Sequence, residues 1–369
     1  MKSRTGPVGV GIVGAGNISN TYLENLNSFP DTTVVAVADL FPEAAQRQAE
    51  KFGVGRSGTV ESLLADDDID IVVNLTTPNA HAEVASQAVS AGKHVWNEKP
   101  LTVDRESAQA LLKQADAAGV RVGCAPDTFL GSGLQHTRRL LEQGIIGTPL
   151  TALVLLQSLG PESWHPNPAF FFASGGGPLF DMGPYYLTTM AQTFGPMDSL
   201  AATGSRARET RVVGSGPRAG EEITVSVPTH VSVLARYQSG QSAVMIFSFD
   251  SAIGRTVIEV NGSGGTAVFP DPNTFEGDVV LRRAQPNQPP ETLTGPPAVS
   301  SRGTGVLEMA RAIREGRPHR ASGELAFHVL DTMISIEEAI TAESFVSVQS
   351  TFDLQPPLPD DWDPFAATL

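Results

Sequence analysis

Residues 8–19 read Val-Gly-Val-Gly-Ile-Val-Gly-Ala-Gly-Asn-Ile-Ser, and this stretch decides the fold of the first part of the chain. Its first six residues are a short apolar run ending in glycine, which is typical of a buried strand. The pattern of a helix follows over Ile18–Phe29. Gly14 permits a tight turn, Gly16 lets the backbone approach a ligand closely, and Ser19 is the third small residue of the motif. The stretch predicts a strand, a glycine turn and a helix.

Strand-like and helix-like segments alternate from this turn to residue 125. This alternation predicts a parallel sheet that helices cover on both faces. In that context the glycine turn matches a dinucleotide-binding fingerprint, in which the helix N-terminus faces the pyrophosphate. The expected strands are Val34–Asp39, Ile69–Leu75, His94–Asn97 and Arg121–Ala125, and the expected helices are Pro42–Phe52, Ala80–Ala91 and Asp104–Ala118.

Asp39 ends the second expected strand, where the fingerprint places an acidic residue. Its carboxylate can accept hydrogen bonds from both ribose hydroxyls and would repel a 2′-phosphate. The next residues, Leu40 and Phe41, supply no cation to pair with that phosphate. We therefore expect NAD as the cofactor, in preference to NADP.

The pattern changes after Pro126. A helix is expected at Ser132–Gln143 and a long strand at Leu150–Leu159, and the segments up to residue 290 pair mostly antiparallel. Helices follow at Thr304–Glu315 and Glu324–Ala342. We predict an α/β Rossmann domain over residues 1–125. Residues 126–369 form an α+β domain with a large, mainly antiparallel, open-faced sheet for substrate binding and oligomerisation, whose C-terminal helices are free to pack back on the first domain.

Composition excludes several classes of partner. The net charge of −15 opposes binding to nucleic acid. No apolar run reaches the roughly 18 residues that cross a bilayer, and the short polar start Met1–Pro7 does not read as a secretory signal. The single Cys124 allows no internal disulfide, and no dedicated metal site is expected. A cytoplasmic enzyme without membrane contact fits these observations.

Further motifs extend along nearly the whole chain. They are Thr76-Thr77-Pro78-Asn79-x-His81, Glu98-Lys99-Pro100, Gly144-x-x-Gly147, and Gly175-Gly176-Gly177 leading into Asp181-x-Gly183. Together with the glycine turn they resemble the Gfo/Idh/MocA oxidoreductase family, named after glucose–fructose oxidoreductase and inositol dehydrogenase. The resemblance implies hydride transfer to or from a sugar, polyol or related carbinol. The residues expected to bind the cofactor are Gly14, Gly16, Asn17, Ile18, Asp39, Thr76, Thr77, Pro78, Asn79, His81, Glu98 and Lys99.

Lys99 follows a parallel strand at the edge where open α/β sheets bind ligands. Its ammonium can lower the pKa of a substrate hydroxyl or polarise a carbonyl. On position alone, a surface lysine without a function is an equal alternative. The family motif favours the functional interpretation and implies a cis bond between Lys99 and Pro100.

The second catalytic element departs from the family. There, an aspartate and a histidine four residues later share one helix turn and serve as substrate contact and proton carrier. Asp181 matches the aspartate, but Tyr185 stands at the histidine position. The spacing places both on one helix face. Either Tyr185 does the acid–base work, its phenol pKa lowered by the ammonium of Lys99, or it only shapes the pocket.

His165 is the alternative proton carrier, in the stiff loop Trp164-His165-Pro166-Asn167-Pro168. Trp164 can stack on a sugar ring while His165 and Asn167 supply hydrogen bonds. The competing interpretation is that Trp164 and Phe170–Phe172 form a hydrophobic plug between the two domains. The expected substrate contacts are Lys99, Trp164, His165, Asn167, Asp181 and Tyr185.

Two further residues have open roles. His81 either lies near the nicotinamide edge or caps a helix, and Asp127, just past Pro126, is a candidate for the cleft.

Three functions remain open from the sequence. The first is an NAD(P)-dependent dehydrogenase or reductase acting on a sugar, glycoside or cyclitol, in which Lys99 and Tyr185 handle the hydroxyl proton. The second is an NAD-dependent glycoside hydrolase, and the third is a dinucleotide-binding regulatory protein without catalysis.

The apolar strands Val231–Leu234 and Val244–Phe249 predict a homodimer or homotetramer formed through the open sheet.

Overall fold

The computed structural model describes residues 5–369. These residues form two compact units. The first contains the chain up to Gly131 together with Ala298–Leu330 and Asp353–Leu369, and the second contains Ser132–Pro297 and Asp331–Phe352. The division expected from the sequence, at residue 125, is continuous along the chain, whereas the first unit is assembled from three segments.

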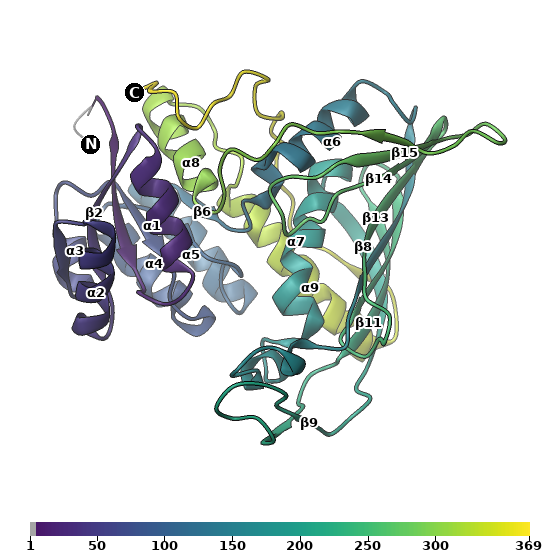
Figure 1. Cartoon of the computed structure of the whole chain (residues 1–369), viewed down its shortest axis with the longest axis horizontal. Helices are drawn as coiled ribbons and strands as arrows, with labels where there is room; N and C mark the ends of the chain where they lie inside the picture. Colours follow the sequence, from purple (N-terminus) through teal and green to yellow (C-terminus); the bar gives the residue numbers. More distant parts are fainter. Residues whose placement is uncertain (1–4) are drawn as a thin grey trace. The chain divides into compact units, whose positions relative to one another are not determined.

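A six-stranded parallel sheet forms the centre of the first unit (Figure 1), in the order β3-β2-β1-β4-β5-β6. This is the strand order of the Rossmann fold, with the change of direction beside β1. Every residue of β1 is buried, which explains why its sequence is apolar throughout. The strands are β1 (Val8–Val13), β2 (Thr32–Ala38), β3 (Arg56–Gly58), β4 (Ile71–Asn74), β5 (His94–Asn97) and β6 (Val122–Cys124).

Local sequence signals set the ends of the helices in this unit. The carboxylate of Asp104 accepts a 2.7 Å hydrogen bond from Ser107 N at the start of α5. Gly119 ends the same helix in the left-handed conformation, with φ of 64°, which glycine adopts without steric cost. The helices are α1 (Ser19–Ser28), α2 (Pro42–Phe52), α3 (Val60–Leu64), α4 (His81–Ser90), α5 (Arg105–Ala118) and α8 (Thr304–Glu315).

Helix α8 explains why a late segment of the chain belongs to the first unit. A Cβ atom on Gly305 would lie 2.1 Å from the ring of Trp96 in β5, so only glycine allows the first turn of α8 to approach so closely. Trp96 is fully buried. Through this contact α8 packs against the parallel sheet and becomes part of the first unit.

The second unit is built on a nine-stranded sheet in the order β16-β15-β14-β13-β7-β12-β11-β8-β17. Its neighbours pair antiparallel except for β12 and β7, which are parallel. The mainly antiparallel sheet predicted from the sequence is confirmed. Its strands are β7 (Pro149–Gln157), β8 (Met197–Ser205), β11 (His230–Tyr237), β12 (Ser242–Ser248), β13 (Arg255–Gly262), β14 (Gly265–Val268), β15 (Val279–Arg283), β16 (Glu291–Leu293) and β17 (Val346–Ser347).

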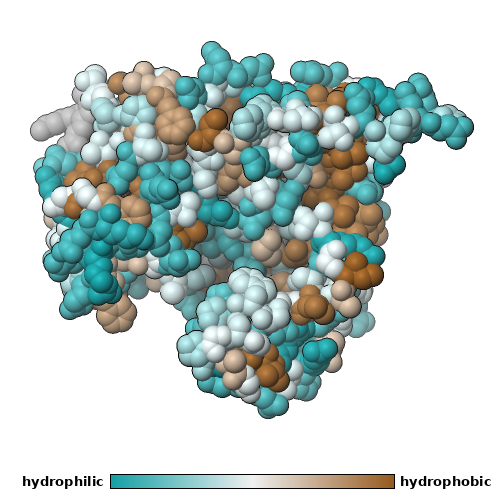
Figure 2. Space-filling model, in the orientation of Figure 1, coloured by the Kyte–Doolittle hydropathy of each residue, from teal (hydrophilic) through white to brown (hydrophobic). Residues whose placement is uncertain are grey.

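The large sheet has one covered face and one open face. Side chains of β11 alternate between buried and more exposed positions along the strand. Helix α7 (Gly177–Phe194) packs against β7, β11 and β12 on the covered face. Figure 2 shows hydrophobic residues gathered along the side where Figure 1 labels β8, β11 and β13. Helix α6 (Ser132–Glu142) also belongs to the second unit. Helix α9 (Gly323–Ala342) is divided between the two units.

A small lobe completes the second unit. The hairpin of β9 (Thr210–Val212) and β10 (Glu222–Thr224) packs with the short helical turn Ala169–Phe172 around its own hydrophobic cluster. No helix within residues 5–369 has the length and apolar character needed to cross a membrane.

Candidate functional site

The glycine turn has the geometry that its sequence predicts. Gly14 has φ of 105°, and a Cβ on it would lie 2.7 Å from the carbonyl oxygen of Leu75, so no larger residue fits. A Cβ on Gly16 would meet no atom within 4 Å, which leaves open space over the backbone. The Ser19 hydroxyl is buried and donates a 2.6 Å hydrogen bond to the Gly16 carbonyl. Protein atoms occupy the space beside Gly14, but the space over Gly16 is available to a ligand.

The start of α1 presents donors to that space. None of the hydrogen bonds among residues 5–369 uses the backbone N–H groups of Gly16, Asn17 or Ile18. Unpaired N–H groups at a helix N-terminus bind anions such as phosphate. The turn and the helix together form an anion-binding cradle.

Asp39 lies beside the same turn. Its Oδ2 accepts a 2.7 Å hydrogen bond from Ala15 N, and its Oδ1 accepts a 2.9 Å bond from Phe41 N. A carboxylate has about four acceptor sites, so two remain for hydroxyl donors. Leu40 and Phe41 are 86% and 65% exposed and bring no positive charge.

The loops after β4 and β5 are joined by a buried polar network. Asn74 and Asn97 end these two strands at paired positions and are both fully buried. Asn74 Nδ2 donates to Asn97 Oδ1 at 3.0 Å, and Thr76 Oγ1 donates to Asn74 Oδ1 at 2.6 Å. Asn97 Nδ2 donates to the carbonyl of Leu101 at 2.9 Å. Thr77, Pro78 and Asn79 at the top of the first loop are exposed and accessible to a ligand.

His81 lies beneath both loops. Its side chain is buried, with Nδ1 2.7 Å from the Pro100 carbonyl and Nε2 3.1 Å from the Thr76 carbonyl. Burial lowers the pKa of His81 below its usual value. Neither ring nitrogen is left for a cofactor.

Glu98 and Lys99 follow β5 at the carboxyl edge of the sheet. Glu98 Oε1 accepts a 2.8 Å hydrogen bond from Tyr22 OH, and Oε2 accepts a 3.0 Å bond from Lys99 N. Trp96 Nε1 donates to the same Tyr22 oxygen at 3.2 Å. Burial raises the pKa of Tyr22 well above 10, with a further contribution from Glu98. The peptide bond between Lys99 and Pro100 is cis, as the family motif implies.

Asp127 is not a cleft residue, and this corrects the sequence expectation. It is 1% exposed, and its Oδ2 accepts 2.9 Å hydrogen bonds from Gly303 N and Gly305 N at the start of α8. Burial, reinforced by the nearby Glu98 charge, raises its pKa to about 6 despite these two donors. Its role is to cap a helix.

Asp181 and Tyr185 lie on α7 of the second unit, four residues apart as expected. Tyr185 is 8% exposed and Asp181 is half-buried. The carbonyl of Tyr185 accepts a 2.8 Å hydrogen bond from Thr189 Oγ1, one turn later in the helix.

The Trp164–Asn167 loop belongs to the small lobe of the second unit. Trp164 is 66% exposed, and the ring of His165 packs edge-on against Trp164, with its centroid 5.5 Å away. His165 Nδ1 accepts a 3.1 Å hydrogen bond from Asn167 N, and Asn167 Oδ1 accepts a 2.6 Å bond from Arg218. Trp164 and Phe170 are exposed on the second unit, whereas Phe171 and Phe172 are buried in the lobe.

Arg211 anchors this lobe. Its buried guanidinium pairs with the carboxylates of Glu162 and Asp250 and donates to the carbonyls of Leu159 at 2.9 Å and Phe249 at 3.0 Å. No local sequence pattern indicates this ion cluster, because its members are far apart along the chain.

Known proteins match both parts of the chain. Residues 8–125 match the family described as an oxidoreductase family with an NAD-binding Rossmann fold, and residues 134–268 match the C-terminal domain of the same family. These two matches span most of the chain. The chain belongs to the Gfo/Idh/MocA oxidoreductase family.

Curated relatives cover most of this oxidoreductase. It is 27% identical over 283 residues to 1,5-anhydro-D-fructose reductase of Ensifer adhaerens, covering 74% of this chain and 80% of that protein. It is 26% identical over 284 residues to myo-inositol 2-dehydrogenase of Thermotoga maritima, covering 75% and 78%. The structure of levoglucosan dehydrogenase with NADH and levoglucosan has the same fold, with a TM-score of 0.79 at 21% identity over 93% of this chain and 99% of that one.

The glycine turn of this oxidoreductase fits NAD. Gly16 leaves room for the pyrophosphate, the start of α1 supplies N–H donors, and Asp39 keeps acceptor sites for ribose hydroxyls. Asn74, Asn97 and Tyr22 were missed as supporting residues. Each of two successive apolar strands ends in an asparagine, and this pattern could have indicated Asn74 and Asn97 from the sequence.

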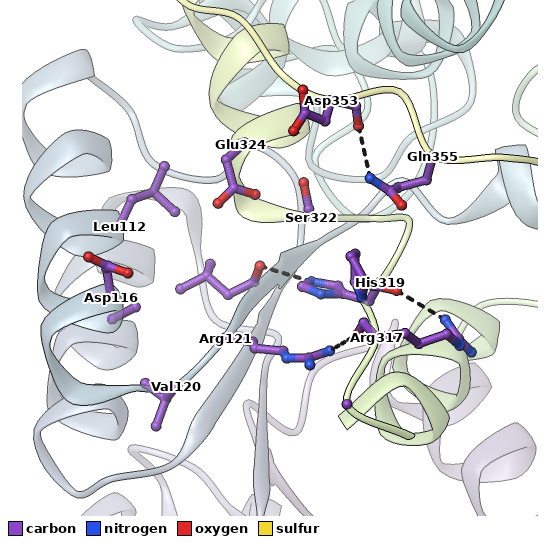
Figure 3. A pocket seen from close by; sticks show the side chains of 14 residues that line it. Leu112, Asp116, Val120, Arg121, Arg317, His319, Ser322, Glu324, Asp353 and Gln355 are labelled. Carbon is purple, nitrogen blue, oxygen red and sulfur yellow. Dashed lines mark hydrogen bonds between the residues drawn. The ribbon is translucent and has the colours of Figure 1, made fainter. Parts of the chain in front are cut away.

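A cavity lies at the amino edge of the parallel sheet, opposite the edge that carries the glycine turn. It has a volume of about 520 Å³ and lies at the amino end of β6, and Figure 3 shows polar side chains around it, including Arg121, His319, Asp116 and Glu324. It contains none of the predicted site residues. Ligands of open α/β sheets bind at the carboxyl ends of the strands, so the site of this oxidoreductase is not placed here.

Proposed function

We propose that this chain transfers a hydride between NAD(H) and a carbinol carbon of a sugar, polyol or cyclitol. One observation carries the proposal: the glycine turn, Asp39 and the loop bearing Lys99 all lie at the carboxyl edge of one parallel sheet. The substrates named for the relatives, an anhydrosugar and an inositol, support this class. When bound, the nicotinamide accepts or supplies the hydride.

We propose that Lys99, assisted by Tyr185, handles the hydroxyl proton of this reaction. A cation beside a substrate hydroxyl stabilises the alkoxide that develops as the hydride leaves. Asp181 is proposed as a substrate contact and Tyr185 as the proton carrier, since they share one face of α7. Trp164, His165 and Asn167 are proposed as substrate contacts, and the exposure of Trp164 supports ring stacking.

Two substitutions separate the candidate proton carriers. Tyr185→Phe keeps the ring but removes the hydroxyl, and His165→Ala removes the imidazole. Turnover that falls in Tyr185→Phe and persists in His165→Ala supports Tyr185. Near-full turnover of Tyr185→Phe refutes that assignment.

We also propose that NAD is preferred over NADP, because Asp39 repels a 2′-phosphate and Leu40 and Phe41 give it no partner. Calorimetric titration of the protein with each cofactor tests this preference. Tighter binding of NADP than of NAD would overturn it.

The reaction itself is tested by incubating the protein with NAD and a panel of sugars, polyols and glycosides while following NADH absorbance. Accumulation of NADH with a polyol or sugar supports the proposal. NAD-dependent cleavage of a glycoside without net NADH indicates a glycoside hydrolase. NAD binding with no reaction on any member of the panel indicates a regulatory protein.

We propose a homo-oligomer, dimer or tetramer, formed through the open face of the large sheet. Leu234 and Val244 are directly paired across β11 and β12 and are 47% and 46% exposed. Val244 is paired in turn with Leu153 of β7, so the apolar row continues across three strands. Exposed contiguous apolar surface marks association sites.

A cytoplasmic location remains a prediction. The single cysteine, Cys124, is a buried free thiol, which supports a reducing compartment. Subcellular fractionation tests it.

A further inference from the structure

The two loops at the carboxyl edge of the parallel sheet share one buried side chain. The first loop follows β4 and carries Thr76, and the second follows β5 and carries Lys99 and Pro100. His81, at the first turn of α4, lies 2.7 Å through Nδ1 from the Pro100 carbonyl and 3.1 Å through Nε2 from the Thr76 carbonyl. The ring is 1% exposed, so water cannot replace either contact.

The His81 ring can donate a hydrogen bond to only one of these two carbonyls when it is neutral. A carbonyl oxygen only accepts hydrogen bonds, and a neutral imidazole has a single N–H. Desolvation lowers the pKa of His81, more than the two carbonyls and Glu98 raise it, and Lys99 adds to the lowering. The ring is therefore neutral at neutral pH, and the shorter contact assigns its proton to Nδ1, directed at Pro100.

Hydrogen bonds hold the second loop on both sides of Pro100, and Glu98 N also donates to the Asn74 carbonyl at 2.9 Å. Asn97 Nδ2 holds the carbonyl of Leu101 at 2.9 Å, and Glu98 Oε2 holds Lys99 N at 3.0 Å. Between these points, the Pro100 carbonyl is held by His81 alone among the hydrogen bonds described for it. The His81 ring therefore holds the peptide bond that follows Pro100, one residue beyond Lys99.

We propose that His81 is a positioning residue for Lys99: its Nδ1–H fixes the Pro100 carbonyl and so sets the direction of the lysine next to it. This rests on the proposed function, in which Lys99 handles the hydroxyl proton. A displacement of about 1 Å of a reacting group can cost up to roughly 100-fold in rate, so loss of this bond lowers turnover without removing any reacting group.

Three substitutions at His81 separate the two ring nitrogens. The amide nitrogen of asparagine occupies nearly the position of Nδ1, whereas that of glutamine reaches nearly the position of Nε2. His81→Asn keeps a donor for Pro100, His81→Gln keeps one for Thr76, and His81→Leu keeps neither. We expect kcat within about threefold of wild type for His81→Asn, and a loss of roughly tenfold or more for His81→Gln and His81→Leu.

His94 provides the matched control. It is a second buried histidine on the same sheet, 5% exposed, and its Nδ1 accepts a 2.9 Å hydrogen bond from Arg121 N at the amino end of β5. His94→Gln and His81→Gln each replace a buried ring in the first unit. We expect comparable losses of thermal stability, but a loss of kcat only for His81→Gln.

A readout independent of turnover keeps the two proposals apart. The chain has five lysines, so carbon NMR of the reductively methylated protein resolves few signals, and Lys99→Arg identifies the one from Lys99. The titration midpoint of Lys99 should move by about half a pH unit or more in His81→Gln and His81→Leu, and stay unchanged in His81→Asn and His94→Gln. Equal effects of the three His81 substitutions, or none, on both kcat and this midpoint would overturn the positioning role. A shifted midpoint in a protein that oxidises no carbinol would uphold it and refute the proposed function.

Discussion

Asp127 makes the stability of the first unit depend on pH in an unusual direction. A carboxylate at a helix N-terminus is ordinarily stabilised by about 0.3–1 kcal/mol, and Asp127 also accepts two backbone hydrogen bonds. Burial outweighs these contributions and raises its pKa from 3.8 to about 6. The folded state therefore binds the proton more tightly than the unfolded state does.

The magnitude follows from the shift. One pKa unit corresponds to 1.36 kcal/mol, so a pKa of about 6 in place of 3.8 makes ionisation of Asp127 cost about 3 kcal/mol of folding free energy. The stabilising effect of the protonated form is fully present below the unfolded pKa and is lost as the pH rises through the folded pKa. About 2 kcal/mol of it is lost between about pH 4.5 and pH 7.5.

Asp127→Asn is the matching perturbation, because one side-chain oxygen accepts both bonds from α8 and an amide oxygen can replace it. Urea unfolding followed by tryptophan fluorescence in a Trp164→Phe background reports on this unit, since the other two tryptophans, Trp96 and Trp362, both belong to it. We expect the stability of wild type, relative to Asp127→Asn, to fall by about 2 kcal/mol over that pH range, a change in relative midpoint of about 1 M urea. Parallel pH profiles for the two proteins, or a relative gain for wild type with rising pH, would refute the reasoning.

Three other predictions concern the cofactor, the lobe and the open sheet. Gly16→Ala should weaken NAD binding at least roughly tenfold by calorimetry with an unchanged melting temperature, since a Cβ there meets no protein atom within 4 Å. Arg211→Met should destabilise the second unit by about 3–5 kcal/mol in chemical denaturation, because it leaves Glu162 and Asp250 without their cation; a loss under about 1 kcal/mol would contradict the account. Val244→Asp should lower the mass measured by light scattering, and an unchanged oligomer would exclude this face.

The sequence predicted the first unit well because its signals are local. An apolar run, a glycine turn and a cap such as Asp104 each act within one segment, and the strand Val8–Val13 and the helix Thr304–Glu315 match the structure at both ends. The packing of α8 on Trp96 depends on residues more than 200 positions apart. No local pattern reports such a contact.

In the candidate site too, residues of a local motif could be predicted, and residues that only the fold brings together could not. Gly14, Gly16 and Asp39 could be assigned from spacing, since the motif itself fixes their geometry. The residues that support the loops could not be assigned in this way. Asn74 and Asn97 meet only because β4 and β5 are neighbouring strands in register. Asp127 was a candidate for the cleft from its position just past Pro126 at the domain junction, whereas its carboxylate accepts hydrogen bonds from the start of α8.

The central claim is that Lys99 takes part in the proton chemistry of the reaction and is not only a contact to NAD. Lys99→Met removes the charge and keeps an unbranched side chain, and steady-state NADH formation with the best substrate can be measured beside NAD affinity. We predict that kcat falls by roughly 100- to 10,000-fold, while the Kd for NAD stays within about threefold. A variant that turns over at the wild-type rate would contradict the account.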